Sequence, residues 1–435
     1  MIRMDVISSP CSPSRRRLNS RNCIALRCQR LLPLAAIVVL AACQSKQTEV
    51  PADVELPKPL ETLSDGYSLP WSIVERGDHT VLVGDKKQRE IWRIDFASGD
   101  RRLLGSTGDG PGEYRWFSEV LPAHADSIAV VVFGAPFKVA LLSPSGRSVR
   151  TVLLSDPAGF DARGVTLRDL PMFSRSDASG NLYGTPERGP KATTTNDRGS
   201  RVPIVRLTLS DGKSDTVAWI PIGEPNQAAR DSGSSRRYRL SRGLYSAAND
   251  WAVFPDGTIV WIDAATYTLT FSQPSGRARV VKVNTPETIP VNPQQFEAYT
   301  DSSIAEIQQI VGKGMSILSG GSGAKKGNAE TQFIRPAPPT QLPPVLANAV
   351  RRILATTNQL WVPVAGRKSP VAEYWDVLDT LGVRRGRFAL PSRTELRAVS
   401  SRYVYTVRKD DDDLYWVERR RNPVADHTRD LGRPR

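Results

Sequence analysis

Two copies of one sequence unit lie between residues 77 and 146. The first reads GDHTVLVGDKKQREIWRIDFASG (residues 77–99) and the second reads ADSIAVVVFGAPFKVALLSPSG (residues 125–146). In each copy a polar turn leads into a short apolar strand, a second turn leads into another strand, and a Ser-Gly turn follows. This order of short strands and Gly-marked turns is typical of a blade of a β-propeller.

Four further units follow the same pattern. The second strands of the six units are predicted to start at residues 80, 128, 181, 258, 359 and 403, in steps of 48, 53, 77, 101 and 44 residues. The short steps match one four-stranded blade of about 40 to 50 residues, and the two long steps require insertions. The sequence therefore predicts an all-β protein, a six-bladed β-propeller with an inserted amphipathic helix and flexible loops. A β-sandwich with extra hairpins is the alternative.

The two ends of the repeat region indicate how the ring closes. The last unit ends soon after Glu418 and lacks an outer strand, which the region Val50–Leu60 is expected to supply.

A helix is predicted within an insertion at about residues 285–345. Asn292-Pro293 combines an N-cap with a proline at the first helical position. One apolar stripe follows, made by Phe296, Thr300, Ile304, Ile307 and Val311. We expect this helix to pack over one face of the propeller. The segments 191–200, 227–242 and 312–327 are predicted to be loops, and the last lacks the spacing of a phosphate-binding loop.

The first 42 residues predict a cleaved signal peptide, because a basic region precedes an apolar stretch too short to span a bilayer. Leu40-Ala41-Ala42-Cys43 resembles the lipobox of bacterial lipoproteins, which implies lipidation of Cys43. An ordinary secretory signal with a chance cysteine is the alternative. Gln44 favours the outer membrane or the periplasmic face. The predicted domains are a signal peptide (1–42), a tether (43–59), the propeller (60–421) and a polar tail (422–435).

Cysteine and charge content limit the class of protein. All four cysteines, Cys11, Cys23, Cys28 and Cys43, lie in the leader or at the lipidation position, so the mature domain can form no disulfide. The net charge of +14 falls to +8 without residues 1–42, which carry seven arginines and one aspartate. Without a zinc-finger or aromatic RNA-binding signature, this excess favours lipid head groups or anionic glycans over nucleic acid, and the commonest role of such an excess is solubility alone.

One loop carries a family resemblance. Gly108-Asp109-Gly110-Pro111-Gly112-Glu113-Tyr114 resembles the Gly-x-Gly-Pro-Gly-Glu-aromatic loop of bacterial six-bladed β-propeller lipoproteins, relatives of the NHL-repeat and TolB-like propellers. The resemblance implies a binding or scaffold module at the cell surface or in the periplasm. Within the loop we expect the glycines to permit the crossover between blades and Glu113 to accept backbone N–H groups, which is a structural role.

No pattern predicts a catalytic, cofactor or metal site. The histidines His79, His124 and His427 are not at metal-ligand spacing, and the Gly-x-Ser-x-Gly elbow of serine hydrolases is absent. Calcium stays open, because carboxylates that could approach a central channel occur at Glu119, Asp177, Asp250 and Asp376. Residues 410–413, four consecutive aspartates, lack EF-hand spacing and predict a solvated turn.

Two functions fit these patterns. The first is a lipid-anchored cell-envelope propeller that acts as a non-enzymatic binding or scaffold module for a protein or glycan, and the second is a calcium-dependent hydrolase or lactonase. Three or four inner-strand carboxylates or amides around the channel would favour the enzyme. An apolar or basic channel capped by the helix at 293–311 would favour binding. An envelope sensor domain is a third class, which the absence of a spanning helix in the sequence disfavours.

Overall fold

The protein is described by a computed structural model over residues 54–425, except 64–65, 78, 109, 111–112, 134–136, 155–170, 187–200, 222–229, 233–234, 241–244, 285–288, 313–329, 348–351 and 366–373. Cys43, Pro111 and Gly112 lie outside the described residues, as do the predicted loop at 191–200 and most of the one at 312–327.

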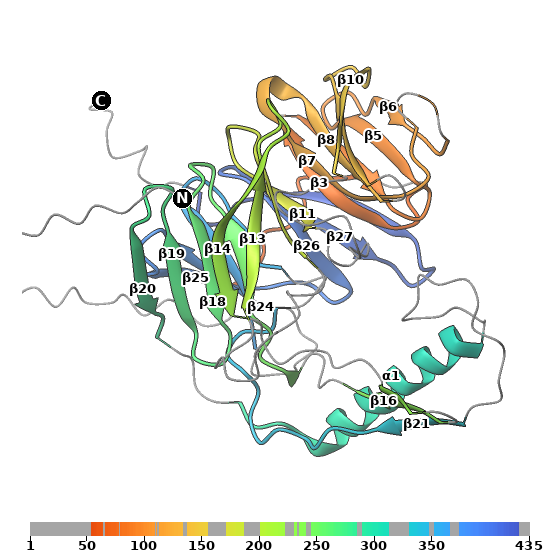
Figure 1. The fold of residues 1–435 in the computed structure, drawn as a ribbon, viewed down its shortest axis with the longest axis vertical. Helices are drawn as coiled ribbons and strands as arrows, with labels where there is room; N and C mark the ends of the chain where they lie inside the picture. Colours follow the sequence, from red (N-terminus) through yellow and green to blue (C-terminus); the bar gives the residue numbers. More distant parts are fainter. Residues whose placement is uncertain are drawn as a thin grey trace, which may run out of the picture. The chain divides into compact units, whose positions relative to one another are not determined.

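Six antiparallel sheets form the blades of a β-propeller (Figure 1). Blade I contains β3 (Pro70–Arg76), β4 (Thr80–Asp85), β5 (Glu90–Asp95) and β6 (Arg101–Gly105). Blade II contains β7 (Phe117–Pro122), β8 (Ile128–Val132), β9 (Lys138–Leu142) and β10 (Ser148–Leu153). Blade III contains β11 (Pro171–Ser176), β12 (Leu182–Pro186), β13 (Arg201–Leu207) and β14 (Ser214–Pro221).

The other three blades complete the ring. Blade IV contains β17 (Asp250–Val253), β18 (Ile259–Asp263), β19 (Thr268–Ser272) and β20 (Ala278–Lys282). Blade V contains β22 (Leu354–Ala355), β23 (Gln359–Val364), β24 (Tyr374–Asp379) and β25 (Arg384–Ala389). Blade VI contains β26 (Thr394–Val399), β27 (Tyr403–Lys409) and β28 (Tyr415–Arg421). The inner strands β3, β7, β11, β17, β22 and β26 contact one another in that order, and β26 returns to β3. The prediction of six blades is confirmed.

The N-terminal part of the propeller closes the ring as expected, with an outer strand that begins one residue after the predicted segment. The outer strand of blade VI is β2 (Glu61–Leu63), which pairs antiparallel with β28. Two described residues of the predicted segment also bond to β28: the Leu60 N–H donates to the carbonyl of Arg419 at 2.8 Å, and the Pro57 carbonyl accepts a hydrogen bond from the Arg420 guanidinium at 2.8 Å. Farther upstream, β1 (Val54–Glu55) pairs in parallel with β25 and adds a fifth strand to blade V. The segment 54–63 therefore joins two neighbouring blades.

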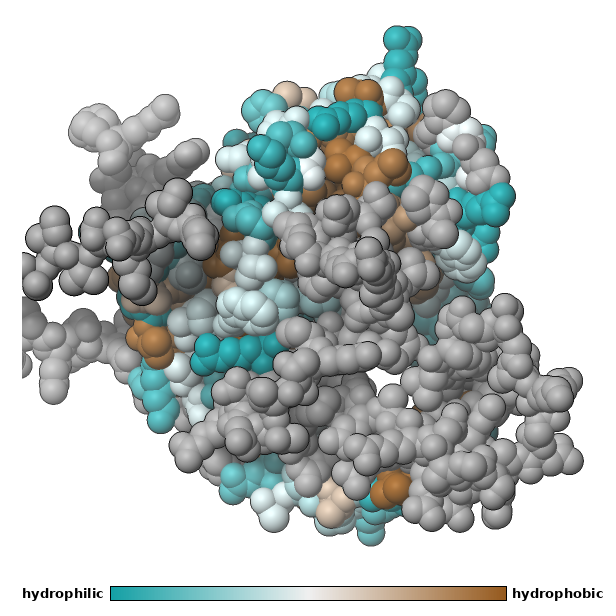
Figure 2. All heavy atoms as spheres, viewed as in Figure 1, coloured by the Kyte–Doolittle hydropathy of each residue, from teal (hydrophilic) through white to brown (hydrophobic). Residues whose placement is uncertain are grey.

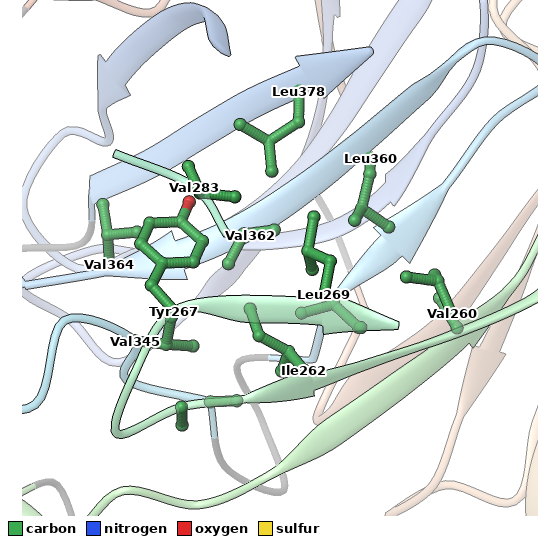
Figure 3. Close-up of a cluster of buried hydrophobic side chains, with 14 of the residues drawn as sticks. Val260, Ile262, Tyr267, Leu269, Val283, Val345, Leu360, Val362, Val364 and Leu378 are labelled. Atoms are coloured by element: carbon green, nitrogen blue, oxygen red, sulfur yellow. The ribbon is translucent and has the colours of Figure 1, made fainter. Parts of the chain in front are cut away.

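A cluster of buried hydrophobic side chains fills the space between each pair of neighbouring blades. Figure 3 shows the one between blades IV and V, where Ile262 and Leu269 lie near Val362. Outer strands are more exposed, and the view in Figure 2 shows hydrophilic residues interspersed with hydrophobic ones. No disulfide is needed, because burial of these alternating apolar residues supplies the main stabilising free energy.

The strands of a blade alternate in direction, so the blade-to-blade connections and the turns between second and third strands lie at one end of the ring. We call it the crossover end. The turns between first and second strands, and between third and fourth strands, lie at the opposite end. This division decides which residues can meet at either mouth of the central channel.

The insertions leave the ring at the crossover end. Helix α1 (Pro293–Gly312) begins as predicted, since Asn292 Oδ1 accepts the N–H of Gln294 at 2.9 Å. Phe296 is fully buried, and its ring packs edge-to-face on Tyr245 with centroids 5.0 Å apart. No described helix is long and apolar enough to cross a membrane.

The prediction of a loop at 227–242 is partly wrong. It contains β15 (Arg230–Ser232) and β16 (Ser235–Arg239), which form a small sheet with β21 (Glu330–Ile334). Strands β16 and β21 pair in parallel, so this sheet joins the two insertions to each other, near α1 in Figure 1.

Candidate binding site in the central channel

A pocket of about 150 Å³ opens in the central channel. Residues of the inner strands β3, β7, β11, β22 and β26 line it, so nearly the whole ring contributes. Trp71 lies near the start of β3, and Lys86 lies in the turn between β4 and β5. Both positions belong to the crossover end, where the insertions also leave the ring.

Both carboxylate oxygens of Glu119, on β7, accept hydrogen bonds. Oε1 accepts hydrogen bonds from Trp71 Nε1 and Arg352 Nη1, each at 3.0 Å. Oε2 accepts the hydroxyl of Ser72 at 2.9 Å, and the Ser72 oxygen in turn accepts the N–H of Val120 at 3.1 Å. The Glu119 carboxylate is therefore a fixed negative charge that joins blades I and II at the channel wall.

Arg175, on β11, is buried, and its positive charge is only partly balanced by nearby acceptors. One of its guanidinium nitrogens lies 4.0 Å from Asp250 Oδ1, while Asp250 Oδ2 accepts the N–H of Ile353 at 2.7 Å. Arg175 Nε is buried and has no hydrogen-bond partner among the described residues. Burial lowers the pKa of Arg175 to about 10, and burial raises the pKa of Asp250. Both shifts show that desolvation outweighs the attraction of this long ion pair.

Three more cations gather around Trp71. Lys86 Nζ lies 3.5 Å from the centroid of the indole ring, and the guanidinium carbons of Arg397 and Arg352 lie 4.6 Å and 5.8 Å from it. Such cation–π contacts are stabilising, and more so when they are desolvated. Burial lowers the pKa of Lys86 to about 8, and repulsion by Arg352 and Arg397 acts in the same direction while Glu119 opposes it.

The charge balance of the channel is positive. Lys86, Arg175, Arg352 and Arg397 face Glu119 and Asp250, and Glu395 pairs with Arg397. Four cations against three carboxylates leave a charge of +1 in a partly dehydrated pocket. Arginines in this setting bind planar anions well, because their N–H groups form a rigid fork.

The four carboxylates considered from the sequence separate in the structure. Glu119 lies in the channel pocket and Asp250 begins inner strand β17 beside Arg175. Asp177 follows β11 and accepts hydrogen bonds from Asn181 and from the Tyr183 hydroxyl, both at 2.8 Å. Asp376 lies on β24, fully buried, where it binds Arg387 and the Tyr267 hydroxyl. The last two therefore stabilise blades and do not face the channel.

Hydrogen bonds within the turn at residues 410–413 hold the side chain of its first aspartate. Asp410 accepts the N–H of Leu414 at 2.9 Å and the indole N–H of Trp416 at 2.6 Å, within an exposed turn. Among the described residues, no three His, Cys, Asp or Glu side chains lie close enough together to hold a metal ion.

The loop that carries the family resemblance fastens blade I to blade II. Glu113 Oε2 accepts the N–H of Gly110 at 2.9 Å, and Tyr114 donates its N–H to the carbonyl of Ser106 at 2.8 Å. The Tyr114 ring is 2% exposed and packs at the interface of blades I and II beside Phe117. These contacts give the loop a structural task.

Sequence reasoning missed the cations of the channel. Trp71, Arg175 and Arg397 lie on inner strands, at different distances before the turn that marks each repeat. The repeats were recognised by their second and third strands, so the inner strands were not compared.

No protein-family model and no curated protein matches the sequence. Several solved structures are similar in fold. A Bacteroides fragilis protein named for inferred export has 12% identity and a TM-score of 0.45, over 86% of this chain and 98% of its own. Virginiamycin B lyase from Staphylococcus aureus has 10% identity and a TM-score of 0.39, over 83% and 98% of the two chains. Regucalcin, a calcium-binding protein from Agrobacterium tumefaciens, has 12% identity and a TM-score of 0.38, over 84% of this chain and 96% of its own.

Similarity at this level gives no information on activity, since one fold serves many functions. The strand pairing and the channel define a six-bladed β-propeller with a basic site at its centre.

Proposed function

We propose that the protein is a lipid-anchored propeller of the cell envelope that binds, without catalysis, a carboxylate group of a protein or glycan. The observation that carries this proposal is the cluster of Lys86, Arg175, Arg352 and Arg397 around the channel pocket. A carboxylate would find arginine N–H groups in a site that is already partly dehydrated, where charge-assisted hydrogen bonds are strongest.

Charge and size favour a single carboxylate as the bound group. The channel carries +1, which one carboxylate neutralises, and fixed Glu119 would repel a group of higher charge. A volume of about 150 Å³ holds one small polar group and leaves the rest of a larger ligand at the crossover end. The Trp71 ring already contacts Lys86 and Arg397, so its role is to hold these cations in place.

The calcium-dependent hydrolase draws little support from the same residues. Glu119 and Asp250 are hydrogen-bonded to Arg352 and to the Ile353 N–H, and each lies near a further arginine. A calcium ion would have to displace these partners and enter a positively charged pocket. A thermal melt with EDTA and then with calcium tests this alternative, because a tight site would raise the Tm.

Titration calorimetry on the purified full-length protein tests the binding proposal. The probes are glucuronate and N-acetylglutamate, with glucose and N-acetylglutamine as uncharged matches. The variant Arg352→Gln should weaken binding of the acidic probes at least tenfold. Arg277→Gln, at an exposed turn of blade IV, is the matched control and should bind as the wild type does. Equal binding of acidic and uncharged probes, or an unaffected Arg352→Gln variant, would refute the proposal.

The anchor is tested separately in a bacterial host. Wild-type protein should incorporate an alkyne-labelled fatty acid and fractionate with membranes, and Cys43→Ser should do neither. Label retained in the Cys43→Ser variant would place the lipid elsewhere or contradict lipidation at this position.

A further inference from the structure

A second and larger cleft lies between blades I and II. Its volume is about 500 Å³, and it shares no lining residue with the channel pocket. The turn between β3 and β4 and the turn between β9 and β10 contribute Gly77, Pro144 and Ser145, so the cleft opens at the end of the ring opposite the crossover end. Blades I and II lie side by side in Figure 1, from β3 to β10.

Three arginines line this cleft, on three strands of blade I: Arg76 on β3, Arg93 on β5 and Arg102 on β6. Among the described residues of the lining, Asp126 is the one acid, and its side chain is 85% exposed. Leu82, Ile128 and Pro144 supply apolar wall. The described residues of the lining therefore carry a charge of +2.

Arg93 and Arg102 are directly opposite each other on neighbouring strands, and Leu82 is opposite Arg93 on the other side. Like charges at directly opposite positions destabilise a sheet. Neither arginine forms a hydrogen bond or ion pair with another described side chain. The fold thus holds two guanidinium groups side by side without a hydrogen-bonded carboxylate, although Arg93 is near enough to Asp95, on the same strand, to contribute to the lowered pKa of that carboxyl.

Leu82, Arg93 and Arg102 form a row of directly opposite residues across the second, third and fourth strands of blade I. In two other blades the corresponding row contains an ion pair. In blade III the row facing the next blade is Tyr183, Arg206 and Asp215, with an ion pair of 2.9 Å between the last two. In blade VI it is Tyr405, Arg419 and Glu61, again with an ion pair. Blade I keeps the arginine but has Leu82 in place of the tyrosine and Arg102 in place of the acid. The smaller side chain leaves space, and the second arginine leaves positive charge.

Arg76 adds a third cation at the edge of the cleft. Its guanidinium donates to the carbonyl of Ser127 and lies 3.8 Å from Asp126 Oδ1. Arg76 Nε is buried and has no hydrogen-bond partner among the described residues, and burial lowers the pKa of this side chain. An anion in the cleft would offset the electrostatic cost of this desolvation.

We propose that the cleft between blades I and II is a second anion site, which binds a phosphomonoester. The charge of +2 matches a phosphate dianion, and arginine forks bind phosphate oxygens in pairs. The volume exceeds that of a phosphate ion and falls in the usual range for small-molecule sites, so the organic part of the ester lies against Leu82, Ile128 and Pro144. A free organic phosphate and a lipid headgroup share this chemistry.

The decisive variant is Arg102→Glu, which restores the arginine–acid row of blades III and VI. The folded protein should melt at a higher temperature than the wild type in phosphate-free, low-salt buffer, because a repulsive pair becomes an ion pair. Calorimetry with glycerol 3-phosphate should show at least a tenfold loss of affinity. A variant that had merely misfolded would melt lower, so the two readouts separate loss of the site from loss of the fold.

Controls and a second variant keep the test independent of the channel. Arg277→Gln and Arg352→Gln should bind glycerol 3-phosphate with unchanged affinity. Leu82→Tyr should fill the cleft with the aromatic ring found in the other two blades and should also abolish binding.

The source of the phosphate is resolved by sedimentation with vesicles of phosphatidylcholine, with and without phosphatidic acid. Wild type and Arg102→Glu carry the same leader, so a difference between them on phosphatidic acid vesicles reports a lipid headgroup. Binding of soluble glycerol 3-phosphate without such a difference reports a free organic phosphate. If the wild type binds neither probe, or Arg102→Glu binds both as the wild type does, the proposal is overturned.

Discussion

Replacement of Glu119 by glutamine distinguishes an anion-binding channel from a catalytic or calcium-binding one. The carboxylate accepts hydrogen bonds from Trp71, Ser72 and Arg352. Glutamine keeps the size and one acceptor oxygen but removes the negative charge, so the charge of the channel rises from +1 to +2. An acidic ligand should therefore bind more tightly to the variant.

The magnitude follows from the repulsion that is removed. Two unit charges about 7 Å apart, across a small pocket with an effective dielectric constant of about 20, repel each other by about 2 kcal/mol. Solvent in the open pocket reduces this value, so we expect the Kd for glucuronate to fall by about fivefold to thirtyfold. The fold should lose about 1–3 kcal/mol, because the charge-assisted bond to Arg352 becomes a neutral one.

The assay is titration calorimetry with glucuronate and N-acetylglutamate, with a thermal melt of each variant. Glu297→Gln is the control, since Glu297 is an exposed carboxylate on α1 that pairs with Arg335. Tighter binding combined with a Tm lower by a few degrees supports the proposed role. A catalytic carboxylate or a calcium ligand would give a loss of function, and weaker binding by Glu119→Gln would refute the reasoning.

Three further predictions concern stability. Burial lowers the pKa of Lys86 from its ordinary value of 10.5 to about 8. Between these two pH values the unfolded chain binds a proton that the folded chain does not, so the stability of the fold rises with pH. Lys86→Met should therefore melt higher than the wild type at about pH 7, with a difference that shrinks towards pH 10; a constant difference would contradict this. Tyr267→Phe removes a 2.9 Å hydrogen bond to fully buried Asp376 and should cost about 1.5–3 kcal/mol in urea unfolding, and an unchanged midpoint would be inconsistent with that bond. Gly180→Ala should cost more than Gly276→Ala: both have positive φ, but only at Gly180 would a Cβ meet backbone, 2.4 Å from the His124 nitrogen. Equal losses in unfolding free energy would show that backbone strain alone decides.

The repeating part of the fold was predictable because neighbouring residues in the sequence determine its turns and strands. The second strands begin at Thr80, Ile128, Leu182, Ile259, Gln359 and Tyr403, within one residue of the predicted positions. Turns that need positive φ fix several of these starts, as at Gly77, Gly180 and Gly257. The helix start at Pro293 was predictable for the same reason, since its cap lies one residue away.

Pairings between distant segments were less predictable. β2 has three residues and β1 has two, and neither has a pattern of its own beyond an extended backbone. β16 pairs in parallel with β21, which lies in the other long insertion. A sequence shows which segments can be strands, whereas their partners depend on the closed ring.

The channel site was not predictable for a related reason. Arg352 and Glu119 are more than two hundred residues apart in the chain and form a 3.0 Å hydrogen bond. Arg175 and Arg397 are isolated basic residues on half-buried strands, so they look like ordinary strand positions. Only the ring brings them around Trp71.

Internal repetition separates structural charges from charges available to a ligand. Arg206 and Arg419 each have an acid on the neighbouring strand, and their ion pairs are part of the blade. Selection for stability alone would favour such an acid at position 102 as well, because two opposed arginines cost about 0.2–1 kcal/mol relative to a neutral pair. Arg102 departs from the pattern of blades III and VI, in the blade whose row also has Leu82 in place of the tyrosine. The two departures occur together and have one explanation in common, which is an anion that occupies the space and balances the charge.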